Sequence, residues 1–156
     1  AQSAPMMSAV NSDAAQRAGV SLDYEGSEPA PEAMMWNTLA AHKLLTWVRE
    51  EHGAKRQTAL KLALFAAHFN HRRKIGEHGV LLDIADEVGL DRVGAQAALE
   101  SEELTAKVRA EERAAYDMNI SGVPAMVVAG TFLIPGAQPP EAYINALRRV
   151  AEKVTR

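Results

Sequence analysis

The stretch that decides the fold is ISGVPAMVVAGTFLI, residues 120–134. It holds two short apolar runs, residues 125–128 and 131–134, separated only by an Ala-Gly pair. Apolar runs joined by so short a glycine-containing link are typical of a β-hairpin. Pro124 stands directly ahead of the first run, and because proline has no N–H to donate to a ladder, it suits the first position of a strand. The stretch therefore predicts a loop that enters a hairpin at Pro124.

Upstream of the hairpin, apolar residues recur at helical spacing. Asn37 or Thr38 can cap a first helix, which Gly53 ends as a left-handed C-cap. Asp91 and Ser101 can cap two later helices in the same way. Each amphipathic helix must bury its apolar stripe against another element. We therefore predict one helical core, made of Leu44, Val48, Leu62, Phe65, Phe69, Leu81, Ile84 and Val88.

The two ends of the chain complete the pattern. Residues 5–19 are predicted as a short helix, and residues 20–24 alternate apolar with polar side chains, as in a short strand or extended segment. Residues 25–31 are a loop by their Gly and Pro content. Residues 136–140 form a second loop, and apolar residues at helical spacing over residues 143–154 predict a final helix.

The bulk composition limits the function classes. The net charge of −3 gives no electrostatic case for nucleic acid or an anionic membrane as partner, and no apolar run approaches the ~20 residues that span a bilayer. The chain has no cysteine, which excludes a disulfide, a thiolate zinc site and a cysteine nucleophile within it. The opening segment lacks the charged and apolar regions of a signal peptide, which slightly favours the cytoplasm.

Four motifs together resemble the DsbA family, and its FrnE-like branch in particular. They are NTLAAH (residues 37–42), DIADEVGL (83–90), ISGVP (120–124) and GAQPPE (136–141). The first and third recur in DsbA-like and kappa-class glutathione-transferase-like proteins, whereas GAQPPE after the hairpin is more particular to the FrnE-like branch. The resemblance covers about residues 5–152.

This resemblance implies an α/β, thioredoxin-like (DsbA-type) fold with an all-helical insertion. Residues 1–36 would hold a helix, an extended segment and a linker, residues 37–100 the insertion, and residues 101–156 the C-terminal thioredoxin-like portion. The family's N-terminal β-α-β unit, with Cys-x-x-Cys at a helix N-terminus, has no counterpart in this sequence. The chain would thus be mostly α, a fragment of the family's fold, and inactive by itself in thiol–disulfide exchange.

The resemblance also implies which residues touch the substrate. Pro124 would match the family's cis-proline, although from local sequence alone trans is the commoner isomer. The Val123 backbone would pair with an extended peptide or protein thiol substrate by strand addition. His42 would be a further candidate near the active site. The resemblance implies no catalytic residue, metal or other cofactor within this chain.

Three histidines could be interpreted as a metal site, since His68 and His71 lie three apart and His78 follows. The basic residues beside them, at positions 72–74, would repel a cation, so a solvated helix end is the favoured interpretation. A two-stranded hairpin is marginal by itself and would leave an open apolar edge. We expect a missing N-terminal segment or a second copy of the chain to cover that edge.

Two other functions stay open. One is a relative of the kappa-class glutathione transferases or of 2-hydroxychromene-2-carboxylate isomerase, which would use serine and glutathione. The other is a non-catalytic helical module that holds peptides at Val123. The residues encoded upstream of Ala1 would discriminate among the three functions, since Cys-x-x-Cys, a serine or a start codon would each select one.

Overall fold

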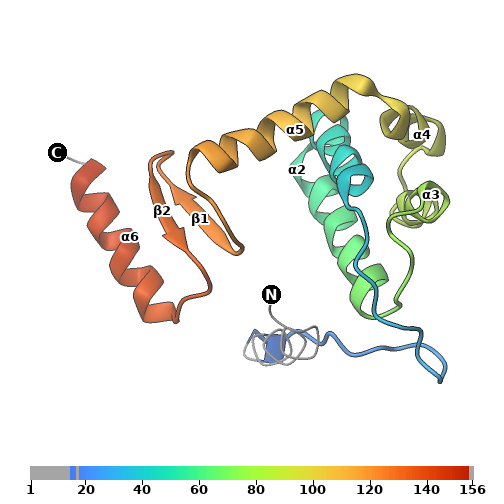
Figure 1. The fold of residues 1–156 in the computed structure, drawn as a ribbon, viewed down its shortest axis with the longest axis horizontal. Coiled ribbons are helices and arrows are strands. Elements are labelled where there is room, and N and C mark those ends of the chain that lie inside the picture. The colour runs from blue at the N-terminus through green and yellow to red at the C-terminus, as the bar shows by residue number, and fades with distance from the viewer. Residues whose placement is uncertain (1–14, 17, 155–156) are drawn as a thin grey trace. The chain divides into compact units, whose positions relative to one another are not determined.

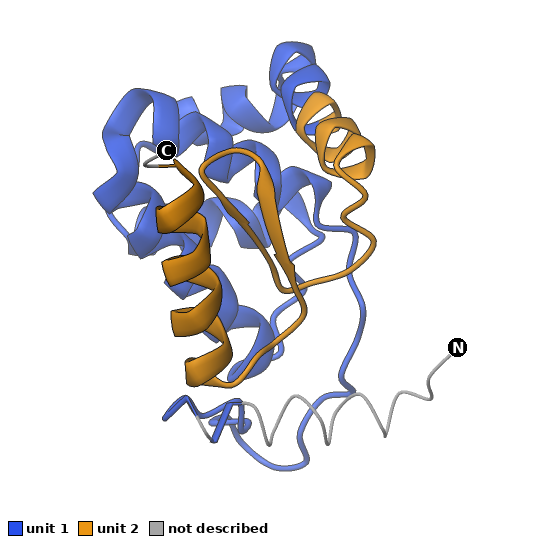
Figure 2. Cartoon of the chain, turned by 90° about the vertical axis from the view of Figure 1, so that its left-hand side faces the viewer, with its two compact units in different colours: residues 1–108 blue, residues 109–156 orange. Residues whose placement is uncertain are grey.

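The computed structural model describes residues 15–16 and 18–154, so that most of the predicted helix over residues 5–19 lies outside the described residues. The chain divides into two compact units, residues 1–108 and residues 109–156 (Figure 2). The two units do not test the predicted division of the chain into three parts, which stays a prediction.

The first unit is helical. It contains α2 (Leu39–Phe69), α3 (His78–Glu87), α4 (Arg92–Glu100) and the beginning of α5 (Glu102–Asp117), and α2, α3 and α4 contact one another (Figure 1). Their buried apolar side chains form one cluster, in which Leu44, Val48, Leu60, Leu81 and Ile84 are fully buried. None of the helices in the described part of the chain is long and apolar enough to span a membrane.

Gly53 divides α2 into two helices. Its φ of 81° and ψ of 175° interrupt the helical backbone, in a conformation that residues with a Cβ rarely adopt. The chain changes direction at Gly53, and the two parts of α2 contact each other. The Gln57 side chain donates to the Leu45 carbonyl, 12 residues earlier, at 3.1 Å. The predicted end of the first helix at Gly53 is confirmed, but the ψ of 175° lies outside the left-handed helical region, so the predicted left-handed C-cap geometry is wrong.

The predicted helix starts are also confirmed. The Asp91 carboxylate accepts from the Gly94 N–H at 2.6 Å, and the Ser101 hydroxyl accepts from the Leu104 N–H at 3.1 Å. At the start of α2 the Asn37 side chain accepts from the Leu39 N–H at 3.0 Å. These bonds satisfy N–H groups that have no partner within the helix.

Lys43 is a buried cation that joins α2 to the end of α4. Its side chain is 7% exposed, and its Nζ donates to the Leu99 carbonyl at 2.7 Å. A helix C-terminus has free carbonyls and a partial negative charge, which favour a cation there. Lys43 therefore acts as a tertiary cap on α4.

One prediction about the first unit was wrong, and one of two alternatives for residues 20–24 is excluded. Leu62 and Phe65 are 61% and 53% exposed, because the core-facing stripe of that helix is made by Leu60, Leu64 and Ala67 instead. Residues 20–24 form no strand. They are held by Asn70, whose side-chain amide donates to the Ser21 and Asp23 carbonyls. The other predicted core residues are buried or, in the case of Phe69 and Val88, half-buried.

The second unit holds the rest of α5, the antiparallel strands β1 (Ala125–Val128) and β2 (Phe132–Pro135), and α6 (Pro140–Val154), which contacts β2. The predicted hairpin is confirmed. Ala129 and Gly130 at its turn have positive φ values of 51° and 69°, and the Thr131 N–H donates to the Val128 carbonyl at 3.2 Å, which closes the turn. Val150 is the only buried apolar side chain among the described residues of this unit.

Candidate peptide-binding loop

The loop that leads into β1, residues 120–124, is fixed at both ends. At the end of α5, Asn119 has a left-handed φ of 58°, and the Ile120 N–H donates to the Ala115 carbonyl at 3.0 Å. These features are typical of a helix C-terminus that ends in a left-handed residue, as predicted at Asn119. At the strand side the Gly136 N–H donates to the Pro124 carbonyl at 2.8 Å. The loop is therefore anchored to α5 and to β2.

Val123 lies fully on the surface of this loop. Its side chain is 92% exposed, and neither its backbone N–H nor its C=O makes a hydrogen bond to any other described residue. The Val123–Pro124 peptide bond is cis, the isomer that the resemblance implies. A free donor and acceptor directly ahead of a strand are the groups that an added extended peptide would use.

The edge of β1 continues this pattern of free backbone groups. Hydrogen-bonded and non-hydrogen-bonded pairs alternate along an antiparallel ladder. Because Pro124 and Gly136 are bonded, the pairs that follow in the register, Met126 with Ile134 and Val128 with Phe132, are the bonded ones. The backbone groups of Ala125 and Val127 therefore point away from β2. In the described residues the sheet has only these two strands, so this edge has no third strand beside it.

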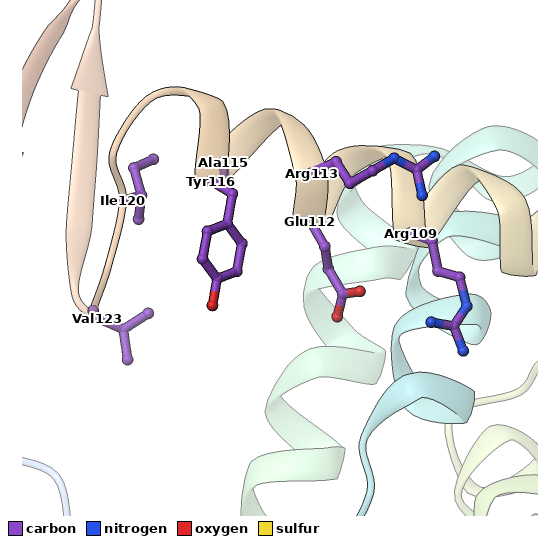
Figure 3. Close-up of a pocket in the computed structure, with 8 residues that line it drawn as sticks. Arg109, Glu112, Arg113, Ala115, Tyr116, Ile120 and Val123 are labelled. Atoms are coloured by element: carbon purple, nitrogen blue, oxygen red, sulfur yellow. The ribbon is translucent and has the colours of Figure 1, made fainter.

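A hollow of about 500 Å³ lies between this loop and the end of α5. Arg109, Glu112, Arg113 and Tyr116 line it from one face of α5. The side chains of Arg109, Glu112 and Tyr116 extend to the same side of the helix as Val123, and that of Arg113 runs along the helix (Figure 3). Tyr116 is 79% exposed. The surface beside Val123 is therefore wide and open, and it carries an aromatic ring, two arginines and one glutamate.

The other sequence candidates lie in the first unit. His42 is exposed on the first turn of α2, and its side chain makes no hydrogen bond to another described residue. His71 and His78 are exposed as well. His68 is different, because its Nδ1 is buried without a hydrogen-bond partner and its ring packs edge-on against Phe69 at 4.6 Å. Burial lowers the pKa of His68. No group of three or more His, Asp or Glu side chains in the described residues could hold a metal ion.

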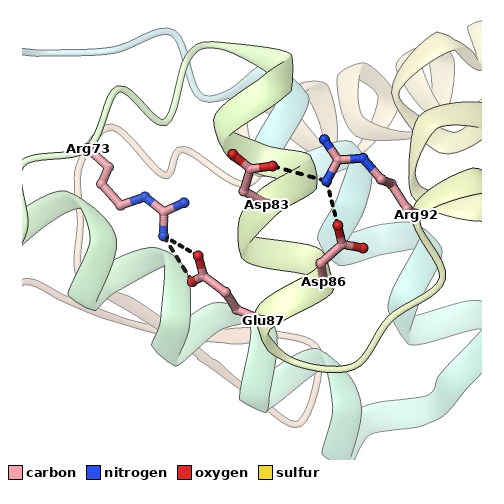
Figure 4. Close-up of polar contacts among 5 residues, drawn as sticks. All are labelled: Arg73, Asp83, Asp86, Glu87 and Arg92. Atoms are coloured by element: carbon pink, nitrogen blue, oxygen red, sulfur yellow. Dashed lines mark hydrogen bonds and ion pairs between the residues drawn. The ribbon is translucent and has the colours of Figure 1, made fainter.

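The acidic motif DIADEVGL has a structural role that the sequence analysis missed. Asp83 and Asp86 both pair with Arg92 of α4, and Glu87 pairs with Arg73 through both carboxylate oxygens at 2.9 Å (Figure 4). The Arg92 guanidinium donates to the carboxylates of Asp86 and Asp83, and these hydrogen bonds, that to Asp86 first, raise the pKa of Arg92. The motif thus holds α3 to its neighbours. The sequence did contain a signal for these ion pairs: Asp83 and Asp86 lie nine and six residues before Arg92.

Comparison with known proteins identifies the class. A family model described as the DSBA-like thioredoxin domain matches residues 2–148. The chain therefore belongs to the DSBA-like thioredoxin domain family, and its largely helical version of that fold is as predicted.

Individual proteins are similar to the chain over part of their length. A probable DsbA oxidoreductase from Streptomyces coelicolor has a TM-score of 0.72 and 28% identity, over 86% of this chain and 55% of that one. The cytosolic disulfide reductase DsbM from Pseudomonas aeruginosa, at 22% identity and a TM-score of 0.55, shares the fold over 74% of this chain and 61% of its own. The uncharacterized protein YwbO of Bacillus subtilis (strain 168) is 32% identical over 85 residues, 54% of this chain. The chain spans 42% of YwbO and about half to three fifths of the two solved structures.

Proposed function

We propose that this chain is the substrate-holding and helical portion of a DsbA-type, FrnE-like thiol–disulfide oxidoreductase. The observation that carries the proposal is the family match over residues 2–148, together with the free backbone of Val123 at the entrance to β1. The reacting thiols must come from polypeptide outside these 156 residues, because the chain has no cysteine.

The chemistry assigns a limited task to this chain. In exchange, a thiolate attacks one sulfur of a disulfide, a new S–S bond forms, and the other sulfur leaves as a thiolate. No residue of this chain can be that nucleophile. Its contribution is to hold an extended peptide against the Val123 N–H and C=O, which supplies affinity through main-chain hydrogen bonds with little dependence on side chains.

A peptide titration tests the holding role. ¹⁵N-labelled protein is titrated with an extended peptide whose cysteines are S-methylated, so that binding is separated from exchange. We expect the amide signals of Val123 and Ala125 to shift, while that of Gly94 on α4 stays constant as a control. Saturable binding without a shift at Val123 would place the peptide elsewhere and contradict the proposed site.

The absence of cysteine also favours a second candidate, a non-catalytic module that binds peptides at the same loop. These two functions and the glutathione-dependent isomerase differ in the residues encoded upstream of Ala1. Cys-x-x-Cys there supports the oxidoreductase, a serine at the equivalent turn supports the glutathione-dependent isomerase, and a start codon supports the module.

A further inference from the structure

The second half of α2 has two opposite apolar faces, of which only one is covered. Leu60, Leu64 and Ala67 are 0%, 5% and 2% exposed and belong to the core. Successive residues turn by about 100° around a helix, so Leu62 lies about 200° from Leu60. Leu62 and Phe65 are 61% and 53% exposed on that opposite side.

The uncovered face is an organised stripe. Leu62, Phe65 and Phe69 follow at i, i+3 and i+7, and the rings of Phe65 and Phe69 contact each other with centroids 6.3 Å apart. We call these three residues the outer stripe. Isolated exposed apolar residues are normal on a protein surface, whereas a row of them marks an interaction site.

The charges beside the outer stripe have one sign. Between Ala54 and Gly76 the chain contains no Asp or Glu. Lys55 and Lys61 on the exposed surface of this helix have no ion pair with any described residue. Some other surface cations of the unit are paired, as Lys107 is with Glu50 at 3.0 Å and with Glu103 at 3.2 Å, whereas Arg49, like Lys55 and Lys61, has no ion pair with any described residue. The outer stripe is therefore apolar and bordered by uncompensated lysines.

We propose that the outer stripe seats a helix of the thiol-bearing polypeptide, with an apolar face bordered by carboxylates. This inference rests on the proposed function. The matched relatives are longer than this chain, which covers 55% of the Streptomyces coelicolor protein, so polypeptide of comparable size is available to cover the stripe. Amphipathic helices use apolar anchors at i, i+3, i+4 and i+7 when they lie on such a surface. Carboxylates on the helix borders complement Lys55 and Lys61 and exclude wrong partners.

Two other occupants fit the surface less well. Two copies of the stripe placed face to face would bring Lys55 and Lys61 near their own equivalents, and such like-charge contacts are costly. An anionic membrane attracts a protein by roughly 1 kcal/mol for each basic residue near its surface. Two unpaired lysines therefore contribute too little to hold the stripe on a membrane.

The test uses the absence of cysteine, since a single introduced thiol is then the only one to label. Phe65→Cys is prepared in the 156-residue chain, with Val93→Cys on α4, which is 77% exposed, as the matched control. The probe is a synthetic amphipathic helical peptide with leucines on one face and glutamates on its borders. We expect it to slow maleimide labelling at position 65 about tenfold or more and to leave position 93 unchanged.

A second peptide, with lysines in place of the glutamates, tests the charge argument. We expect it to give no protection, and we expect Lys61→Glu to weaken the acidic peptide about tenfold. Equal protection by both peptides, no protection by either, or protection only by phosphatidylserine vesicles would overturn the proposal.

The same labelling in the gene product extended upstream of Ala1, with any native cysteines changed to serine, identifies the occupant. Protection at position 65 is expected, and full reactivity there would refute the proposed occupant. Exchange activity of the unaltered extended product is a separate measurement. Exchange activity with a fully reactive position 65 would support the proposed function and refute the docking. Protection at position 65 without exchange activity would support the docking and refute the proposed function.

Discussion

Replacing Gly53 with alanine tests whether the corner in α2 depends on glycine. No atom lies within 4 Å of the position that a Cβ would occupy there, so the substitution creates no clash. The cost is conformational, because φ 81° with ψ 175° is a region used almost only by glycine. That cost is about 1–3 kcal/mol, and alanine offsets about 0.4–1 kcal/mol of it by restricting the unfolded chain. We expect a net loss of roughly 1–2 kcal/mol.

The assay is urea unfolding followed by far-UV circular dichroism, with two controls. Gly79→Ala lies within α3 and also meets open space, so it should stabilise the protein by about 0.5–1 kcal/mol. D-Alanine at position 53, introduced by semisynthesis, accepts a positive φ and should be neutral or stabilising. If Gly53→Ala and Gly79→Ala change the unfolding free energy alike, the backbone argument is refuted.

Three further changes test individual contacts. Lys43→Ala should cost about 1.5–3 kcal/mol in urea unfolding, since a charged hydrogen bond to the buried end of α4 is lost, whereas exposed Lys61→Ala should cost almost nothing. Ala129→Asn should stabilise the hairpin by about 1 kcal/mol, because asparagine tolerates the left-handed φ of 51°; an unchanged melting temperature would contradict this. Burial lowers the pKa of His68 from 6.5, so the unfolded state binds the proton more readily and stability should fall as the pH drops below that value. A pH–stability profile that His68→Gln leaves unchanged would exclude this contribution.

Local signals made much of the fold predictable. The caps at Asp91 and Ser101, the helix break at Gly53 and the hairpin turn each depend on a few neighbouring residues whose chemistry is specific to that geometry. The loop at Val123 and Pro124 was predicted from its resemblance to a family.

The errors came from features that local patterns do not determine. In the second half of α2 both faces are apolar, and periodicity alone does not say whether Leu64 or Phe65 faces the core. The alternation over residues 20–24 predicted a short strand or an extended segment. A strand requires a neighbouring strand, and this segment is bound instead by the side chain of Asn70. Lys43 was not predicted at all, since its partner carbonyl is 56 residues away in the sequence.

The most direct test of the central claim is thiol–disulfide exchange, measured as insulin reduction by dithiothreitol. The assay compares the 156-residue chain with the gene product extended upstream of Ala1 and with that product's Cys→Ser variants. We predict background rates for the chain alone, catalysis by the extended product, and loss of that catalysis when its cysteines are replaced. Catalysis by a homogeneous preparation of the 156-residue chain, or an extended product without cysteine or without exchange activity, would contradict the account.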